Sequence, residues 1–151
     1  MRQLNDEAAR LRADALAVAD DDAAAFSAVG AAYQLPRETE AQKATRRAGI
    51  QQALIGAAGP PARVGLLAAR LVEMAHELVE SSNPNVLSDV AVASSAARAA
   101  LEGAIVNIEI NVRQIQDEAE VSRLESAVSG LETAMDAASR TVGAVREKLR
   151  P

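Results

Sequence analysis

The carboxylate best placed to do chemistry is Asp22, because it interrupts an otherwise apolar helical seam. The seam advances in steps of four and three, the spacing of one helix face, and comprises Leu4, Ala8, Leu11, Ala15, Val18, Asp22, Ala25, Val29 and Ala32. A carboxylate buried on such a face would have a raised pKa suited to proton transfer. Alternatively, Asp22 lies at an edge of the seam that meets water.

A polar stripe is expected on a long helix later in the chain. At 3.6 residues per turn, one narrow line of that helix carries Asp89, Ala96, Gly103, Asn107 and Asn111. Asn107 and Asn111 stand among large aliphatic residues, where an unpartnered amide costs stability. We therefore expect them to bond each other across helices, or to bind a ligand. Asp89 lies about 27 Å from Asn107 along the helix axis, so both reach one ligand only if it is long or an antiparallel second chain brings them together.

Other candidate residues have ordinary structural explanations beside the chemical ones. Asn83 or Asn85 suits a helix N-cap, with Pro84 in the first turn. Asp89 near the same helix start would favour the helix dipole without any further role. A basic patch of Lys43, Arg46 and Arg47 suits a solvated face, or a site for a ligand that carries carboxylates.

Composition excludes several classes of protein. The chain has no cysteine and one histidine, which rules out disulfides, zinc fingers and thiol catalysis. Its net charge of −5 argues against a nucleic-acid partner, which requires a basic surface. No phosphate-binding loop, nucleophile elbow, zinc-protease or EF-hand pattern occurs. The N-terminal residues contain no uninterrupted apolar run, so we expect no signal peptide, no membrane span and a cytoplasmic protein.

The elements that must position these residues are all helices. Of 151 residues, 35 are alanine, the best helix former, and only 1% are aromatic. We predict a first helix ending at Leu35-Pro36 and a second over residues 39–58. Gly59-Pro60-Pro61 should break or kink it, with a third helix over 61–79. Residues 81–85 form a loop, residues 86–116 a long helix, and Asp117 caps a last helix.

The last helix carries a regular apolar seam through Val121, Leu124, Val128, Leu131, Met135, Ala138, Val142, Val145 and Leu149. Four heptads of this kind form a coiled-coil-like packing edge. The fold class is therefore all-α: one domain, residues 1–151, built as a multihelical bundle of long antiparallel helices. Alanine buries little apolar area, so the core is thin. Oligomerisation is the usual remedy, and we expect a homodimer formed by helix packing.

The ordered set of motifs resembles the formiminotransferase-cyclodeaminase family. It consists of Asp22-Ala23-Ala24-Ala25-Phe26, Tyr33, the stretch from Arg47 to Pro61, Asn83-Pro84-Asn85-Val86-Leu87-Ser88-Asp89, Asn107-Ile108-Glu109-Ile110-Asn111 and Asp117. The resemblance covers nearly the whole chain. It implies an all-helical, dimeric protein that binds reduced folate and acts on the one-carbon unit at N5 and N10 of tetrahydrofolate. The reaction would be cyclodeamination of the 5-formimino form or hydrolysis of the 5,10-methenyl form, with no metal or redox cofactor.

The resemblance also suggests roles for the candidate residues. Asp22 and Asp89 would be the catalytic acid and base, in an order left open. Five side chains would hydrogen-bond the pterin or orient the acids: Asn83, Asn85, Ser88, Asn107 and Asn111. Lys43 and Arg47 would hold the glutamate tail of the folate.

One departure from the family pattern leaves alternatives open. Family members begin several dozen residues earlier, with a Pro-Gly-Gly-Gly segment and a further helix that this sequence does not contain. Three explanations stay open: a shortened homologue, a misassigned start, or a fragment that keeps the helical scaffold. Three functions stay open as well: an active folate enzyme, a catalytically silent folate-binding or regulatory homologue, or a helical interaction module. Cyclodeaminase and cyclohydrolase activities are equally compatible with the sequence.

Overall fold

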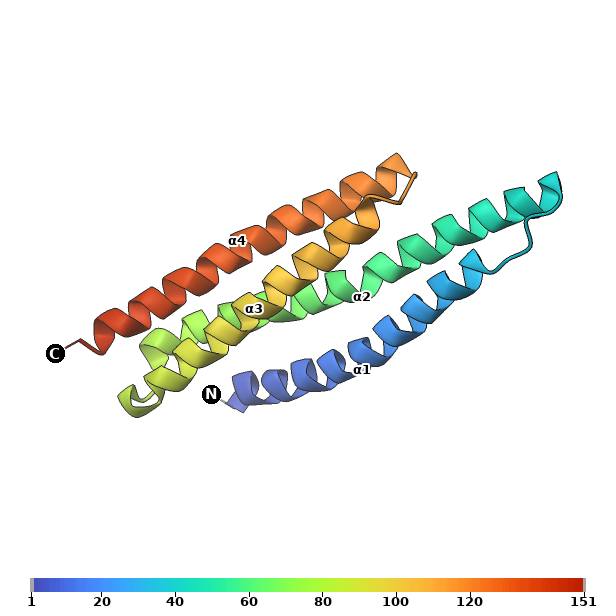
Figure 1. Cartoon of the computed structure of the whole chain (residues 1–151). Coiled ribbons are helices and arrows are strands. Elements are labelled where there is room, and N and C mark those ends of the chain that lie inside the picture. Colours follow the sequence, from blue (N-terminus) through green and yellow to red (C-terminus); the bar gives the residue numbers. More distant parts are fainter. Residues whose placement is uncertain (1, 151) are drawn as a thin grey trace.

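Four long helices make up the protein in a computed structural model, which describes residues 2–150. They are α1 (Arg2–Tyr33), α2 (Glu40–Ser81), α3 (Leu87–Val112) and α4 (Glu118–Lys148), with the short 3-10 helix η1 (Pro84–Val86) between α2 and α3. Successive helices run in opposite directions, so the start of α1, the η1 turn and the end of α4 lie at one end of the bundle (Figure 1). The predicted all-α bundle of long antiparallel helices is confirmed.

Side-chain caps explain where the helices begin. Thr39 and Gln42 form a reciprocal capping box at the start of α2. The Asp117 carboxylate accepts hydrogen bonds from the backbone N–H groups of Ala119 and Glu120 and so starts α4, as the sequence predicts. Asn83 caps η1 by accepting from the Asn85 backbone at 3.0 Å. α3 ends at Val112, four residues before the predicted end.

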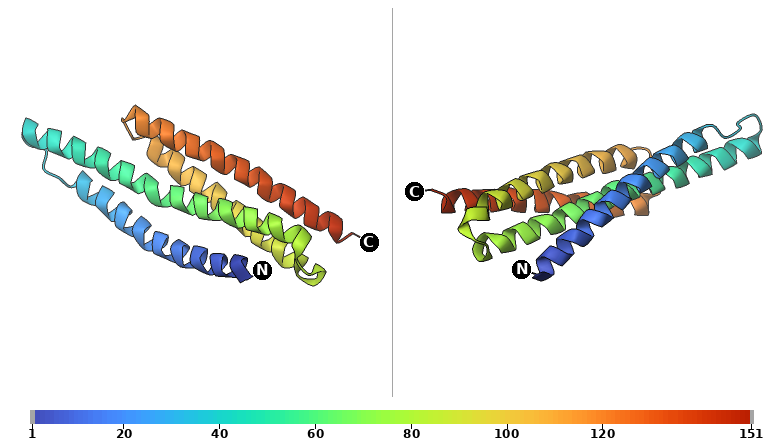
Figure 2. Two further views of the ribbon diagram at one scale, coloured as in Figure 1. Left: turned by 180° about the vertical axis from the view of Figure 1, so that it is seen from behind. Right: turned by 90° about the horizontal axis from the view of Figure 1, so that it is seen from below.

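The helices are packed unequally. α3 contacts both α2 and α4, whereas α1 contacts only α2 within the described part of the chain. Figures 1 and 2 show the consequence: α1 stands on one side of the bundle and α4 on the other, and α1 is splayed away from α3. Of the residues of α1, only Val18 and Ala32 are buried. One flank of α1 and one flank of α3 therefore remain uncovered.

The predicted apolar seam of α4 packs inside the chain, whereas that of α1 is only partly covered. Leu124, Leu131, Ala138 and Val145 of the α4 seam are buried. Of the α1 seam, Val18 and Ala32 are buried, and Ala15 and Asp22 are exposed. Gly65 of α2 allows α4 to approach closely, because a Cβ at that position would collide with the Leu131 side chain.

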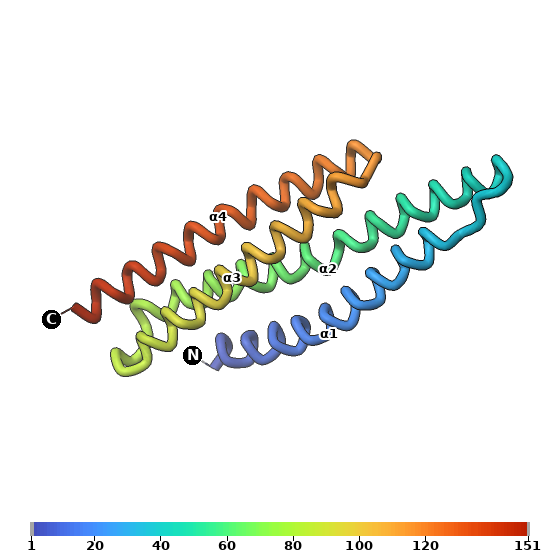
Figure 3. Tube along the Cα trace, in the orientation of Figure 1, coloured from blue at the N-terminus to red at the C-terminus, as the bar shows by residue number. Residues whose placement is uncertain are grey.

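α2 runs through the Gly59-Pro60-Pro61 segment without interruption (Figure 3), and the prediction of a separate helix over residues 61–79 is wrong. A proline inside a helix removes the N–H that would bond the carbonyl four residues earlier, so Pro61 leaves the Ala57 carbonyl without its helical donor. The Asn111 side-chain amide of α3 donates to that carbonyl at 3.4 Å. Both proline rings are buried. Tertiary packing thus supplies what the local sequence lacks.

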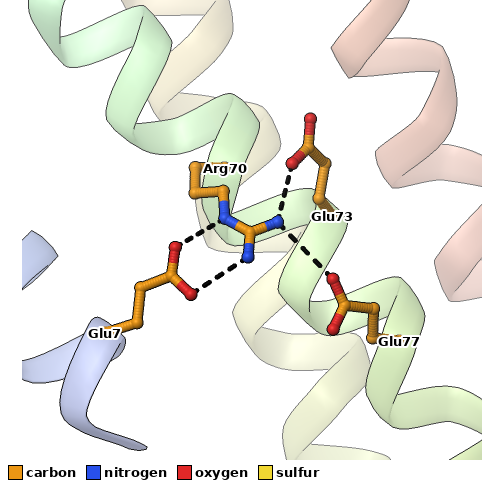
Figure 4. Close-up of polar contacts among 4 residues, drawn as sticks. All are labelled: Glu7, Arg70, Glu73 and Glu77. Carbon is orange, nitrogen blue, oxygen red and sulfur yellow. Dashed lines mark hydrogen bonds and ion pairs between the residues drawn. The ribbon is translucent and has the colours of Figure 1, made fainter. Parts of the chain in front are cut away.

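An arginine-centred ion cluster attaches the N-terminal half of α1 to α2 (Figure 4). Arg70 binds both carboxylate oxygens of Glu7, from Nε at 2.7 Å and from Nη2 at 3.0 Å. Its Nη1 also contacts Glu73 at 2.8 Å and Glu77 at 3.5 Å. The bidentate hydrogen bond from Arg70 lowers the pKa of the Glu7 carboxyl.

Replacing Glu7 with glutamine is expected to lower stability at neutral pH and to have no effect in acid. A carboxyl whose folded-state pKa is lowered adds stability above its unfolded pKa, about 4.3, and loses that stability as the pH falls through the folded value. The denaturation midpoints of wild type and Glu7→Gln should therefore differ at pH 7 and converge below pH ~4. Glu132→Gln is the matched control, since Glu132 is exposed on α4 and forms no ion pair within residues 2–150. A pH-independent difference for Glu7→Gln would contradict this account.

Candidate active site

A groove runs between α1 and α3 with α2 as its floor; we refer to it as the α1–α3 groove. Its central cavity measures about 310 Å³ and is lined by Asp22, Phe26, Val29, Tyr33, Leu54, Ala57, Pro61, Asn107, Ile110, Asn111 and Gln114. An adjoining cavity of about 300 Å³ shares Asp22, Pro61 and Asn107 with it. The groove exists because α1 packs along α2 and makes no close backbone contact with α3, so the facing flank of α3 is left open.

The tertiary structure brings three of the predicted site residues together. Asp22 of α1 faces the groove opposite Asn107 and Asn111 of α3. Asp22 is exposed. Of the two alternatives that the sequence left open, a buried carboxylate or one at a solvent-exposed edge of the seam, the structure shows the second. A carboxylate and two amides across an open groove form a site that can hydrogen-bond a polar ring.

The two asparagine amides are oriented by the backbone. Asn107 Nδ2 donates to the Gly103 carbonyl at 2.8 Å. Asn111 Nδ2 donates to the Asn107 carbonyl at 2.9 Å, in addition to Ala57. The predicted bond between the two side chains does not form within the chain. With both donors engaged on backbone, each side-chain oxygen is left available as an acceptor at the groove.

Asn111→Leu is expected to destabilise the protein by about 1 kcal/mol, because the half-buried Ala57 carbonyl loses its donor. Pro61→Ala restores the missing helical N–H to the same carbonyl. In the Pro61→Ala background, therefore, Asn111→Leu should cost measurably less. A double-mutant cycle by chemical denaturation tests the coupling, and strictly additive effects would show that the two residues do not share this carbonyl.

A basic region forms the end of the groove nearest the α1–α2 turn. A hollow lined by Arg37, Lys43, Arg46 and Arg47 adjoins, through Arg47, a second hollow that reaches Tyr33 and Gln114. Lys43 pairs with Glu40 at 2.8 Å. The guanidinium carbon of Arg46 lies 5.6 Å from the centre of the Tyr33 ring, and the same guanidinium donates a hydrogen bond to the Tyr33 carbonyl. These two contacts attach the end of α1 to α2. Arg47 is left as the cation that connects this region to the groove.

Sequence reasoning missed the glutamines that close this end of the site. The Tyr33 hydroxyl donates to Gln114 Oε1 at 3.2 Å, and Gln51 Nε2 donates to the Gln114 carbonyl at 3.0 Å. Gln51 Oε1 in turn accepts from the Gln116 backbone at 2.8 Å. Gln114 follows Asn107 and Asn111 by seven and three residues, so the helical stripe that identified the asparagines could also have identified it.

The remaining predicted residues lie at the opposite end of the bundle. Asn83, Asn85, Ser88 and Asp89 surround η1 and the first turn of α3, all of them exposed. None lines the α1–α3 groove. Within one chain Asp89 is therefore separated from Asn107 by most of the length of α3, about 27 Å. Their predicted meeting through a second, antiparallel chain stays a prediction.

Two further features concern what the described residues could bind. No group of three or more histidine, aspartate or glutamate side chains within residues 2–150 is arranged to hold a metal ion. None of the described helices has the length and apolar character needed to cross a membrane.

Comparison with known proteins identifies the family to which the chain belongs. The sequence profile of the formiminotransferase-cyclodeaminase family matches residues 1–130. A methenyltetrahydrofolate cyclohydrolase from Methylorubrum extorquens is 33% identical over 131 residues, which are 87% of this chain and 63% of the relative. Rat formimidoyltransferase-cyclodeaminase is 30% identical over 112 residues, 74% of this chain and 21% of the rat protein.

A solved structure shares the fold. The formiminotetrahydrofolate cyclodeaminase of Thermotoga maritima superposes with a TM-score of 0.73 and 26% identity, over 87% of this chain and 62% of the Thermotoga chain. The present chain thus spans less than two thirds of the length of these relatives. The profile match covers most of the sequence, including Asp22, Asn107 and Asn111, and the chain belongs to the formiminotransferase-cyclodeaminase family.

Proposed function

We propose that this protein is a folate one-carbon enzyme that hydrolyses the methenyl bridge of 5,10-methenyltetrahydrofolate. The observation that carries the proposal is the α1–α3 groove, where Asp22 faces Asn107 and Asn111 while cations gather at one end. A folate has the matching order of groups, a polar pterin ring at one end and glutamate carboxylates at the other. The Methylorubrum relative, whose length this chain covers best among the relatives named, is a cyclohydrolase.

The proposed chemistry assigns a task to each residue of the groove. The free oxygens of Asn107 and Asn111 accept hydrogen bonds from pterin N–H groups. The Asp22 carboxylate stabilises the cationic methenyl carbon and takes a proton from the attacking water. Arg47, with Lys43 beside it, binds the glutamate carboxylates. We propose that side chains and water suffice, without a metal or redox cofactor, so a chelator should leave the rate unchanged.

Cyclodeamination is the second candidate, favoured by the fold shared with the Thermotoga cyclodeaminase. There the same carboxylate would protonate the departing amine as the ring closes. The predicted cytoplasmic location, and binding roles for Asn83, Asn85 and Ser88, stay predictions.

We also propose that the protein is a homodimer. The chain exposes 9488 Å², whereas the scaling relation for folded monomers gives about 7,300 Å² for 15.7 kDa. The difference of about 2,200 Å² in exposed surface is similar to the area that each subunit buries in a large obligate interface. Exposed apolar side chains account for part of it, among them Phe26 at 79% and Leu16 at 64%.

The decisive experiment follows the absorbance of 5,10-methenyltetrahydrofolate with and without the purified protein. Loss of absorbance faster than the uncatalysed rate supports a cyclohydrolase. Release of ammonia from 5-formiminotetrahydrofolate, without methenyl hydrolysis, supports the cyclodeaminase instead. Binding without turnover of either compound would identify a catalytically silent folate-binding homologue, and absence of binding would leave only a helical interaction module.

A further inference from the structure

The α1–α3 groove is crossed at one point by a hydrogen bond. The backbones of α1 and α3 make no close contact. Within residues 2–150, the bond from the Tyr33 hydroxyl to Gln114 Oε1, at 3.2 Å, is the only hydrogen bond or ion pair that joins α1 to α3 or to the α3–α4 turn, residues 113–117. We refer to it as the Tyr33–Gln114 bond. It ties together two walls of the groove that otherwise stand apart.

This bond stands at the junction of two hollows with different chemistry. On one side lies the central cavity, which contains Asp22 and the two asparagines of α3. On the other side lies a hollow of about 270 Å³ that contains Arg47 and adjoins the other cations of the basic region; we call it the arginine hollow. The residues that line both are Tyr33, Leu54 and Gln114. The Tyr33–Gln114 bond therefore spans the groove where the two hollows meet.

The floor of the groove places this junction midway along the site. Pro61 of α2 lines the central cavity and Arg47 lines the arginine hollow, and Leu54 lies seven residues from each. Seven residues of helix correspond to about 10 Å. A ligand with one end beside Asp22 and the other end at Arg47 must therefore pass the Tyr33–Gln114 bond. The proposed function requires such a ligand, because it places the pterin ring in the central cavity and the glutamate carboxylates at Arg47.

Both partners of the bond are anchored through their backbones, whereas the bonded side chains lie at the surface. The Arg46 guanidinium donates to the Tyr33 carbonyl at 3.1 Å, and Gln51 Nε2 donates to the Gln114 carbonyl at 3.0 Å. Tyr33 is 46% exposed, and Gln114 is exposed as well. Exposed side chains change rotamer rapidly. Rotation of either side chain toward solvent thus breaks the bond without moving α1 or the α3–α4 turn.

We propose that the Tyr33–Gln114 bond is a gate between the central cavity and the arginine hollow, closed in the free protein and displaced by a ligand that spans both. A ligand confined to the central cavity leaves the gate closed. The gate therefore lowers the affinity for extended ligands and not for short ones, which makes Tyr33 and Gln114 specificity-determining residues. This inference rests on the proposed function, which supplies the extended ligand.

Tyr33→Phe removes the hydrogen bond and keeps the ring beside Arg46. Tetrahydrofolate is a suitable probe, since it carries the ring and the glutamate but no methenyl carbon to hydrolyse. By calorimetry, Tyr33→Phe should bind it about two- to tenfold more tightly than wild type, the usual net contribution of one hydrogen bond. 6-Methyltetrahydropterin, which has the ring without the glutamate, should bind both proteins equally. Equal or weaker binding of tetrahydrofolate by Tyr33→Phe, or an equal gain for both compounds, would overturn the gate.

Gln114→Ala removes the other half of the bond and gives an independent check. It should tighten tetrahydrofolate binding to the same extent, and the double variant should gain no more than either single variant, because all three lack the same bond. Gln52→Ala is the matched control, since Gln52 is exposed on α2, forms no side-chain hydrogen bond within residues 2–150 and lines neither hollow. Its affinity should equal that of wild type. Additive gains, or a gain in the control, would contradict the proposal.

The same measurements separate failure of the gate from failure of the proposed function. If neither wild type nor Tyr33→Phe binds tetrahydrofolate, the proposed function is wrong, and the gate is overturned with it. If wild type binds tetrahydrofolate and hydrolyses the methenyl form, but Tyr33→Phe gains no affinity, the gate alone is wrong.

Discussion

Asp22→Asn is expected to lower the rate of methenyl hydrolysis by about 10²–10⁴-fold, the usual contribution of a general acid or base. The substitution keeps the size of the side chain and removes its charge at the one carboxylate that lines the central cavity. Binding of the folate should weaken much less, since the asparagine and arginine contacts remain. The expected signature is therefore a loss in kcat with a modest change in KM.

The matched control for this experiment is Asp20→Asn. Asp20 is two residues away on the same exposed helix and lines neither cavity of the groove. Turnover should stay within a factor of about two of wild type, because a surface charge near a site changes the rate only through long-range, screened electrostatics. Equal losses in the two variants would mean that the acidic run acts through its overall charge. Full activity of Asp22→Asn would remove Asp22 from the mechanism.

Leu101→Ala is expected to destabilise the protein by about 3 kcal/mol, within the range of 2–5 found for buried leucines. Leu101 has no exposed surface and lies on α3, the helix that packs on both α2 and α4. Truncation leaves a cavity that an alanine-rich core cannot fill with long neighbouring side chains. Against a total stability of 5–15 kcal/mol for a typical domain, this is a large fraction.

Chemical denaturation at a fixed protein concentration measures this effect, since the stability of a dimer depends on concentration. Leu149→Ala serves as the control, because Leu149 is 54% exposed beyond the last turn of α4. Its cost should stay within about 0.5 kcal/mol. A similar loss in both variants would indicate that α3 does not form the centre of the core.

The prolines show where local prediction fails. Proline at positions 60 and 61 predicts a helix break, because each residue removes a backbone hydrogen bond. In the structure α2 continues, since the Asn111 amide replaces one lost donor from another helix and burial of both rings adds apolar contact. The compensating group lies 50 residues away in sequence, beyond the reach of any rule based on neighbouring residues.

The sequence by itself determined the helical class, the cap at Asp117, the start of a helix near Thr39, and the faces of α1 and α4 that point inward. These follow from periodicity and local hydrogen bonding, which depend on residues within a few positions of one another. It also placed Asn107 and Asn111 on one stripe, because helix geometry alone relates them. Helix rise alone also separated Asp89 from Asn107 by about 27 Å. Only the tertiary structure decided that Asp22 faces the two asparagines across a groove. That placement depends on how α1 packs on α2 and diverges from α3, which is a consequence of packing between distant segments.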